Sequence, residues 1–150
     1  MDWPSGELQV VANDHALIEL RFSATDESEN TNSITEKAVR ELTAYFNNNL
    51  KKFTIPLEPK GTTFQKSVWQ ELNQIPFGST ISYLDLAKNL GDEKVIRAAA
   101  SANGKNPIPI IIPCHRVIGS DGSLTGYSGG LEKKRFLLQL EGILGPDLFS

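Results

Sequence analysis

The feature that most constrains this chain is the apolar stretch around its only cysteine, Cys114. Residues 110–112 have the β-branched composition of a fully buried strand, and Pro113 ends that strand because proline cannot donate a hydrogen bond to a sheet. Residues 117–118 then resume the apolar pattern. The sequence therefore predicts that Cys114 lies on a stiff bend between two buried segments.

Two interpretations of Cys114 are open at this point. Composition alone favours a small buried hydrophobe, because most free cysteines in apolar surroundings are inert. The next two residues favour a nucleophile, because His115 and Arg116 are groups of the kind that convert a thiol of pKa ~8.5 into a thiolate. The neighbourhood therefore predicts a reactive cysteine.

Composition narrows the class of protein. A chain of 150 residues holds one ordinary domain or two small domains that share a core. No apolar segment approaches the ~20 residues of a membrane helix, and the first residues lack the pattern of a signal peptide, so we expect a cytoplasmic protein without a membrane partner. One cysteine excludes an internal disulfide, and together with His15 and His115 it gives too few ligands for zinc. We therefore expect no metal.

The net charge of −3 is unevenly distributed. Residues 1–59 hold five Lys/Arg and ten Asp/Glu, whereas residues 60–150 hold ten Lys/Arg and eight Asp/Glu. The half that contains Cys114 is therefore slightly basic. This is a weak electrostatic footprint, so if the partner were a nucleic acid, its binding would be modest and salt-sensitive rather than tight and nonspecific.

The first half of the chain predicts a β-hairpin. Residues 7–12 and residues 16–22 alternate apolar and polar side chains, and the intervening Asn13 and Asp14 are typical turn residues. Two strands alone are only marginally stable in water. The hairpin therefore needs a further element to pack against.

A helix is expected to supply that element. Ser33 followed by Glu36 has the spacing of a capping box, and apolar residues follow at helical spacing. A further strand is expected at residues 53–57. Residues 1–58 thus form a small domain of sheet and helix, to which we assign a structural role because none of its residues looks chemically competent.

Residues 59–150 predict a mostly helical domain. Thr62 and Gln65 form a second capping box. The helix that follows is expected to bury Phe64, Val68, Leu72 and Ile75. The predicted fold class is α/β of the α+β type, with the N-terminal domain packed on a C-terminal domain that carries a helix-turn-helix and a Pro-Cys-His-Arg turn.

The helix-turn-helix pattern lies in the middle of the second half. Ser82 caps a short helix that Gly91 ends, and Asp92 caps a second helix. Arg97 projects from the small-residue surface of that second helix, which suits a close approach to a partner. The alternative for Arg97 is a surface ion pair with Glu93, four residues earlier.

Residues 62–142 closely resemble the O6-alkylguanine-DNA alkyltransferases, also called methylated-DNA–protein-cysteine methyltransferases. The active-site signature of that family, Pro-Cys-His-Arg-Val, stands unaltered at residues 113–117. Further matches in order are Thr63-Phe64-Gln65, Val68-Trp69, Ile75-Pro76-Phe77-Gly78, Ser82-Tyr83, Arg97-Ala98, Asn106-Pro107, Gly126-Tyr127-Ser128-Gly129-Gly130, Leu137-Leu138 and Glu141-Gly142. The resemblance implies a methylated-DNA–protein-cysteine S-methyltransferase.

The resemblance also implies the chemical roles. Cys114 would attack the alkyl carbon of O6-alkylguanine in DNA, with His115 accepting the thiol proton through a water and Glu141 orienting the imidazole. Tyr83 would donate a proton to the departing guanine. Asn106 would be the hinge residue that ties the recognition helix to the cysteine turn.

Substrate contacts follow from the same resemblance. Arg97 would enter the base stack of double-stranded DNA, approached from the minor groove, while the damaged base flips out. The remaining contacts would come from the carbonyl groups of Cys114 and Val117 to the exocyclic amine, Ser120 to phosphate, Tyr127 to the alkyl group and Ser128 to the guanine oxygen.

The product would be a thioether that no residue of the chain could cleave, so each molecule would react once. No cofactor is expected, because side chains supply every group. We expect a monomer, and leave open cooperative binding to DNA and reaction with O4-alkylthymine.

Two other classes of function are weighed against transfer. A DNA-binding module that flags lesions or regulates genes would need no nucleophile, yet Cys114 is present. A cysteine hydrolase would need an imidazole from a separate segment and an oxyanion hole, and His15 in the hairpin is a poor candidate.

Overall fold

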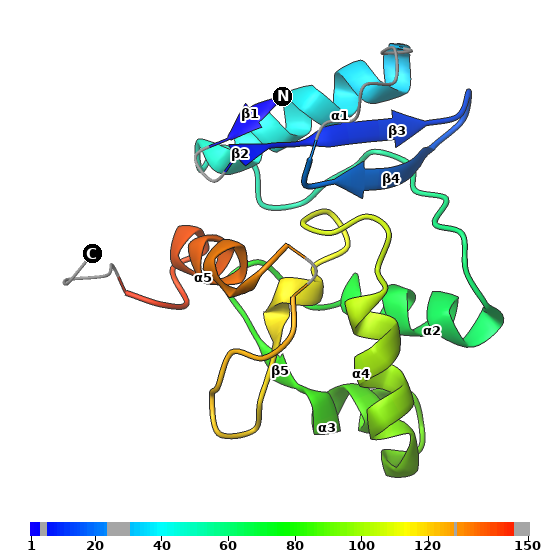
Figure 1. Ribbon diagram of the computed structural model, residues 1–150, viewed down its shortest axis with the longest axis vertical. Helices are drawn as coiled ribbons and strands as arrows, with labels where there is room; N and C mark the ends of the chain where they lie inside the picture. The colour runs from blue at the N-terminus through cyan, green and yellow to red at the C-terminus, as the bar shows by residue number, and fades with distance from the viewer. Residues whose placement is uncertain (4–5, 24–30, 128, 146–150) are drawn as a thin grey trace. The chain divides into compact units, whose positions relative to one another are not determined.

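The structure is a computed structural model that describes residues 1–3, 6–23, 31–127 and 129–145. The chain forms two compact units, one of Met1–Lys60 with Pro107–Ile111 and the other of Gly61–Asn106 with Ile112–Ser150. The first unit combines strands and a helix, and the second is mainly helical (Figure 1). The predicted α+β class is therefore confirmed.

Among the described residues of the first unit, the strands form two antiparallel pairs. The predicted hairpin is present, with β3 (Gln9–Ala12) paired to β4 (Leu17–Arg21). Its turn is closed by the Asn13 side chain, which accepts hydrogen bonds at 2.8 Å from two successive backbone N–H groups. A second, shorter pair, β1 (Asp2–Trp3) with β2 (Gly6–Glu7), was not predicted.

The helix α1 (Ser33–Phe46) packs on β3 and β4 and buries Ala38 and Leu42 (Figure 1). Its N-cap is Asn32 and not the predicted Ser33. The Asn32 side chain accepts from the Thr35 N–H, and Thr35 Oγ1 accepts from the Asn32 N–H, both at 2.9 Å. The true capping box thus lies one residue earlier, because Asn is as good a cap as Ser and Thr35 can complete the pair.

The strand predicted at residues 53–57 is wrong. Only one bridge forms there, between Leu17 and Leu57. The N–H groups of Thr54 and Ile55 donate instead to the carboxylate of Glu41 on α1, at 3.1 and 2.9 Å. A side chain therefore satisfies the donors that a sheet ladder would have used.

The strand predicted at residues 110–112 is also wrong, although its burial is correct. All three isoleucines are at most 5% exposed, but they lie in turns. Pro107 and Pro109 remove two N–H donors, and Ile110 has a φ of 74°, in the left-handed region. Backbone of this kind cannot form a ladder. Ile110 and Ile111 belong to the first unit, within which the Pro107 carbonyl accepts from the Leu20 N–H at 2.9 Å, and Ile112 belongs to the second.

Four helices frame the second unit. They are α2 (Thr63–Leu72), α3 (Tyr83–Asn89), α4 (Ile96–Gly104) and α5 (Leu131–Leu140), with β5 (Ile81–Ser82) paired in parallel to β6 (Val117–Ile118) (Figure 1). The capping box of Thr62 is confirmed. Phe64, predicted to be buried, is exposed, whereas Trp69 is buried and its indole N–H donates to the Ala102 carbonyl at 2.9 Å. That bond ties α2 to α4.

The predicted helix-turn-helix is present. Ser82 caps α3, the chain turns at Gly91 with a φ of 97°, and Asp92 caps a short 3₁₀ turn, η1 (Glu93–Val95), that leads into α4. Helices α3 and α4 pack against each other. Within the described ranges, no helix is long and apolar enough to cross a membrane.

Candidate active site

The cysteine sits on a turn that its own backbone hydrogen bonds close. Pro113 has φ −81° and ψ 65°, the geometry of an inverse γ-turn, and the Cys114 N–H donates to the Ile112 carbonyl at 2.8 Å. The next turn, η2 (Cys114–Arg116), is closed by the Arg116 N–H, which donates to the Pro113 carbonyl at 3.0 Å. The thiol is therefore carried by backbone with little freedom.

Asn106 connects the end of α4 to this turn. Its side-chain N–H donates to the Ile112 carbonyl at 2.7 Å, so the same carbonyl accepts from both Asn106 and Cys114. A hydrogen bond from Asn106 to the Cys114 side chain also favours the thiolate. The structure thus brings Asn106 and Cys114 together, as the hinge interpretation requires.

The thiol itself is not ionised at rest. Cys114 is only 4% exposed, and burial raises the pKa of its thiol to about 11, against the opposing effects of Asn106 and the charge of Lys134. The expectation that His115 and Arg116 would make Cys114 a thiolate in the free protein is therefore wrong. Reaction requires a base that removes the thiol proton.

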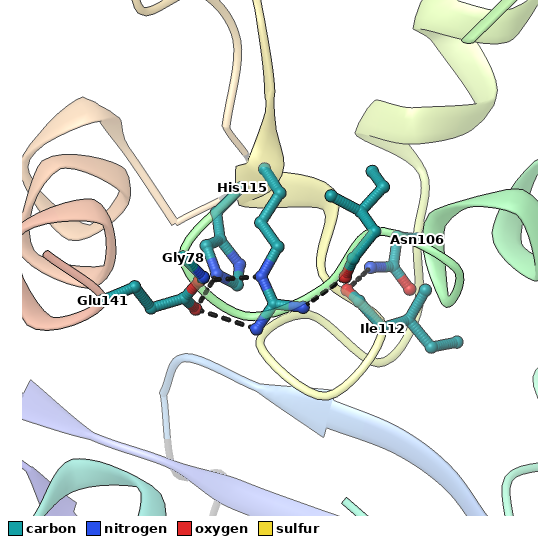
Figure 2. A network of polar contacts seen from close by, with 7 residues as sticks. Gly78, Asn106, Ile112, His115 and Glu141 are labelled. Atoms are coloured by element: carbon teal, nitrogen blue, oxygen red, sulfur yellow. Dashed lines mark hydrogen bonds and ion pairs between the residues drawn. The ribbon is translucent and has the colours of Figure 1, made fainter. Parts of the chain in front are cut away.

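The carboxylate of Glu141, at the end of α5, is the centre of a buried polar cluster (Figure 2). It lies 2.6 Å from His115 Nε2 and accepts from Arg116 Nε at 2.7 Å and Nη2 at 3.1 Å. The Gly78 N–H adds a fourth contact, at 3.3 Å. A carboxylate with this many donors is held ionised, and it is not the exposed helix-end group that the sequence alone would suggest.

This arrangement fixes the tautomer of His115. Because the ionised Glu141 can only accept, Nε2 of His115 carries the proton and Nδ1 keeps a lone pair. Burial lowers the pKa of His115, with Glu141 acting in the opposite direction, so the ring is neutral. Among the described residues, Nδ1 has no hydrogen-bond partner. His115 therefore offers an unprotonated nitrogen suited to accepting a proton.

Arg116 plays a part that the sequence did not reveal. Besides its two bonds to Glu141, its Nη1 donates to the Ile75 carbonyl at 2.7 Å, and its guanidinium lies 5.9 Å from the centre of the Phe77 ring. The arginine thus binds the turn after α2 to the cysteine turn. The sequence showed only that a positive charge follows Cys114. It did not show that this charge forms an ion pair with Glu141.

A second polar group surrounds the carbonyl of Thr125. The hydroxyl of the half-buried Tyr83 donates to this carbonyl at 3.1 Å, and Lys134 Nζ donates to it at 2.9 Å. Lys134 also donates to the Val117 carbonyl at 2.8 Å and is fully buried. Sequence reasoning missed Lys134, although its position on the same face of α5 as Leu137 and Leu138 marked it as buried.

The other predicted contact residues are spread over the unit. Arg97 is exposed on α4 and, within the described part of the chain, makes no hydrogen bond or ion pair; Glu93 pairs instead with Lys88 at 3.9 Å. Ser120 is exposed and Tyr127 half-buried. Ser128 lies outside the described residues.

No metal centre is evident in the described ranges, which contain no group of three or more His, Cys, Asp and Glu side chains that could hold an ion. The site combines a cysteine, a neutral imidazole and a carboxylate, and the same compact unit contains the helix-turn-helix. This combination is typical of proteins that use a nucleophilic cysteine on DNA.

Comparison with known families agrees with that class. The DNA binding domain of 6-O-methylguanine DNA methyltransferase matches residues 63–143, and the ribonuclease-like domain of the same proteins matches residues 1–59. The chain belongs to the 6-O-methylguanine DNA methyltransferase family.

Individual relatives support the assignment. The methylated-DNA–protein-cysteine methyltransferase of Methanosarcina acetivorans is 57% identical over 71% of this chain and 68% of its own length. Its counterpart in Mycobacterium bovis is 43% identical over 97% of this chain and 92% of its own length. The crystal structure of Mycobacterium tuberculosis OGT in complex with DNA has a TM-score of 0.86 at 42% identity and covers 94% of this chain and 89% of the other.

Proposed function

We propose that this protein repairs DNA by transferring the alkyl group of O6-alkylguanine to Cys114 in a single turnover. The proposed type of reaction is supported by the family and by the relatives, which are methylated-DNA–protein-cysteine methyltransferases. The observation that carries the chemistry is the neutral His115, protonated on Nε2 by its bond to Glu141 and free on Nδ1 among the described residues.

These residues supply the nucleophile and the base that the transfer step needs. The Cys114 thiol gives its proton to His115 Nδ1 through a water, and the sulfur attacks the alkyl carbon. A carbon–sulfur bond forms as the bond from that carbon to guanine O6 breaks. Glu141 stabilises the imidazolium that results, and Arg116 keeps Glu141 ionised throughout.

Guanine needs a proton as it leaves. Tyr83 is the proposed donor, since its hydroxyl is half-buried and already directs its proton toward an oxygen atom, the Thr125 carbonyl. During transfer the hydroxyl would turn from that carbonyl to the departing base. The thioether left on Cys114 has no residue to cleave it, so no cofactor or second turnover is involved.

The substrate is double-stranded DNA that carries O6-alkylguanine, with O4-alkylthymine as a further candidate. The relative solved with DNA supports a DNA partner. We propose that α4 approaches the minor groove and that Arg97, which is exposed and unpaired among the described residues, fills the gap left by the flipped base.

The remaining contacts are also proposals. The base pocket would use the carbonyl groups of Cys114 and Val117, with Tyr127 beside the alkyl group. Ser128 would contact the guanine oxygen and Ser120 a phosphate. Half-burial of Tyr127 and exposure of Ser120 are compatible with these roles.

At the level of the whole chain, residues 1–58 are proposed to be structural and residues 59–150 to bind DNA and transfer the alkyl group. The second assignment is supported by the helix-turn-helix and the cysteine turn, which lie in the same compact unit. A cytoplasmic location and a monomeric state are proposed as well, with cooperative assembly on DNA to be tested by titration.

Incubation with the free base O6-benzylguanine, followed by intact-mass spectrometry, tests this function. We expect one added benzyl group per molecule, mapped to Cys114 by peptide analysis, and no further addition with time. The matched control is Cys114→Ser, which should gain nothing. An unmodified wild-type protein, or modification at another residue, would contradict the proposal.

A further inference from the structure

Lys134 is a fully buried lysine that has no acidic partner in the described part of the chain. Its Nζ donates only to the carbonyls of Val117 and Thr125, at 2.8 and 2.9 Å, and within the described residues it forms no salt bridge. Burying an ammonium without a counter-charge costs several kcal/mol, and two carbonyl groups offset only part of that cost. Packing alone would be served better by an apolar side chain at this position.

The two carbonyls that Lys134 holds belong to segments on which the reaction depends. Val117 follows the cysteine turn directly and begins β6. Thr125 lies in the glycine-containing segment before α5, and its carbonyl also accepts from the proposed proton donor, Tyr83. One ammonium group thus links the segment that follows the nucleophile to the carbonyl that the proposed acid, Tyr83, contacts.

The charge of Lys134 is also the one that the site leaves unbalanced. Three charged groups act on the thiol of Cys114 or on the ring of His115: Arg116 on the same turn, Lys134 on α5 and Glu141 at the end of that helix. Tyr83 on α3 shares the Thr125 carbonyl with Lys134. Arg116 and Glu141 neutralise each other at 2.7 Å, and His115 is neutral. When Cys114 gives its proton to His115, Glu141 compensates the imidazolium, and Lys134 is the remaining cation of the site without a carboxylate partner among the described residues.

We propose that Lys134 is a positioning residue for alkyl transfer, whose buried ammonium holds the Val117 and Thr125 segments together and stabilises the Cys114 thiolate as it forms. This inference rests on the proposed function, and it explains why an unpaired lysine is kept inside the unit. Alkylation of Cys114 removes the negative charge of the thiolate. Lys134 therefore stabilises the reacting protein and not the alkylated product.

The pKa directions agree with this geometry. The charge of Lys134 lowers the pKa of Cys114, and the thiolate in turn raises the pKa of Lys134. Burial lowers the pKa of Lys134 to about 8, so the ammonium form dominates at neutral pH and is lost above that value. The benefit of Lys134 should therefore decline as the pH rises past about 8.

The test compares wild type with Lys134→Met in single-turnover reactions with O6-benzylguanine from about pH 6.5 to about pH 9.5. We expect Lys134→Met to react about tenfold more slowly at neutral pH, because loss of an adjacent opposite charge moves a pKa by about one unit or more. The ratio of the two rates should shrink above pH 8, where the wild-type lysine loses its own charge.

Two further variants keep the test decisive. Lys134→Arg retains a charge that does not titrate in this range, so it should recover part of the rate and gain on the wild type above pH 8. Lys133→Met, the same change one position earlier, should react like the wild type. Near-ultraviolet circular dichroism establishes that each variant is folded, and Lys134→Arg alone carries the test if Lys134→Met is not.

The outcomes separate the two proposals. Equal rates for wild type and Lys134→Met, or a rate ratio that is constant with pH, would overturn the thiolate role of Lys134. Failure of the wild type to accept a benzyl group would instead overturn the proposed function. In that case the rate of Cys114 alkylation by iodoacetamide, measured over the same pH range in the same variants, decides whether Lys134 stabilises the thiolate.

Discussion

The chemistry of this site is set by how charges are shared between individual residues. Glu141 accepts from His115 and from Arg116, so the carboxylate that orients the imidazole is itself neutralised by a guanidinium. Burial is the main cause that lowers the pKa of His115, and the charges of Arg116 and Lys134 lower it further. His115 is therefore neutral in the free protein, as the proposed role of proton acceptor requires.

Removing the charge of Glu141 should damage both stability and reaction. In Glu141→Gln the shape is kept, but the buried Arg116 is left uncompensated, which costs about 3–5 kcal/mol of unfolding free energy. The loss of base assistance should slow benzyl transfer by about 10²–10⁴-fold. Urea unfolding and single-turnover kinetics measure the two effects.

The matched control is Glu132→Gln, an exposed carboxylate in the first turn of the same helix. It should lose less than about 1 kcal/mol and no activity. If Glu141→Gln lost as little stability and activity as this control, the buried cluster would not stabilise the fold. The assignment of the His115 tautomer, which depends on Glu141, would then be wrong as well.

At the scale of elements, helices were predictable and irregular segments were not. The capping box at Thr62 could be found because cap and partner lie three residues apart, and Ser82 was predicted as a cap, although its box with Asp85 was not. The strand expected at residues 110–112 failed because apolar composition reports burial, not backbone conformation, and two neighbouring prolines had already removed the donors. The same limit applies at residues 53–57, where Glu41 binds the backbone from a distant helix.

The helix α4 gives a prediction at this scale. Arg97→Ala should slow repair of duplex DNA much more than reaction with free O6-benzylguanine, because only the duplex requires a base to leave the stack, at a cost of about a few kcal/mol. Single-turnover rates with a duplex that contains O6-methylguanine and with the free base provide the comparison.

Lys94→Ala is the matched control for Arg97→Ala. Lys94 is exposed on η1, just before α4, and its loss removes one positive charge without removing an intercalating group. It should weaken DNA binding in a salt-dependent manner while leaving the rate on saturating duplex unchanged. Equal losses on duplex and free base for Arg97→Ala would remove the flipping role.

For the whole molecule, the sequence predicted several residues of the candidate site but not how they are connected. The signature at residues 113–117 marked Cys114 and His115, and the family pattern added Glu141 and Tyr83. The link from Arg116 to Ile75 joins residues that are far apart in the chain, and the bond from Lys134 to Val117 depends on the fold of α5. Such contacts cannot be predicted from the spacing of residues in the sequence, because they form only when the second unit folds.

That closed packing leads to a last prediction, about the protein after reaction. Cys114 is 4% exposed, so an added alkyl group has to be accommodated among close-packed neighbours, at a cost of about 1–3 kcal/mol. Benzylated protein should therefore unfold at a lower temperature than unmodified protein, and methylated protein should lie between them. Differential scanning calorimetry before and after reaction measures this, with Cys114→Ser treated in the same way as the control.

The pH dependence of stability provides an independent check on the same thiol. The folded pKa of Cys114 is raised from 9.0 to about 11, so the folded thiol keeps its proton at pH values where the unfolded thiol has lost it. The unfolded state thus binds fewer protons between these values, and the stability due to this group, complete below pH 9, declines as the pH rises toward 11. An alkylated sulfur cannot titrate, so the benzylated protein should lack this part of the decline. Identical slopes for the two forms would mean that the thiol is not buried in the folded protein.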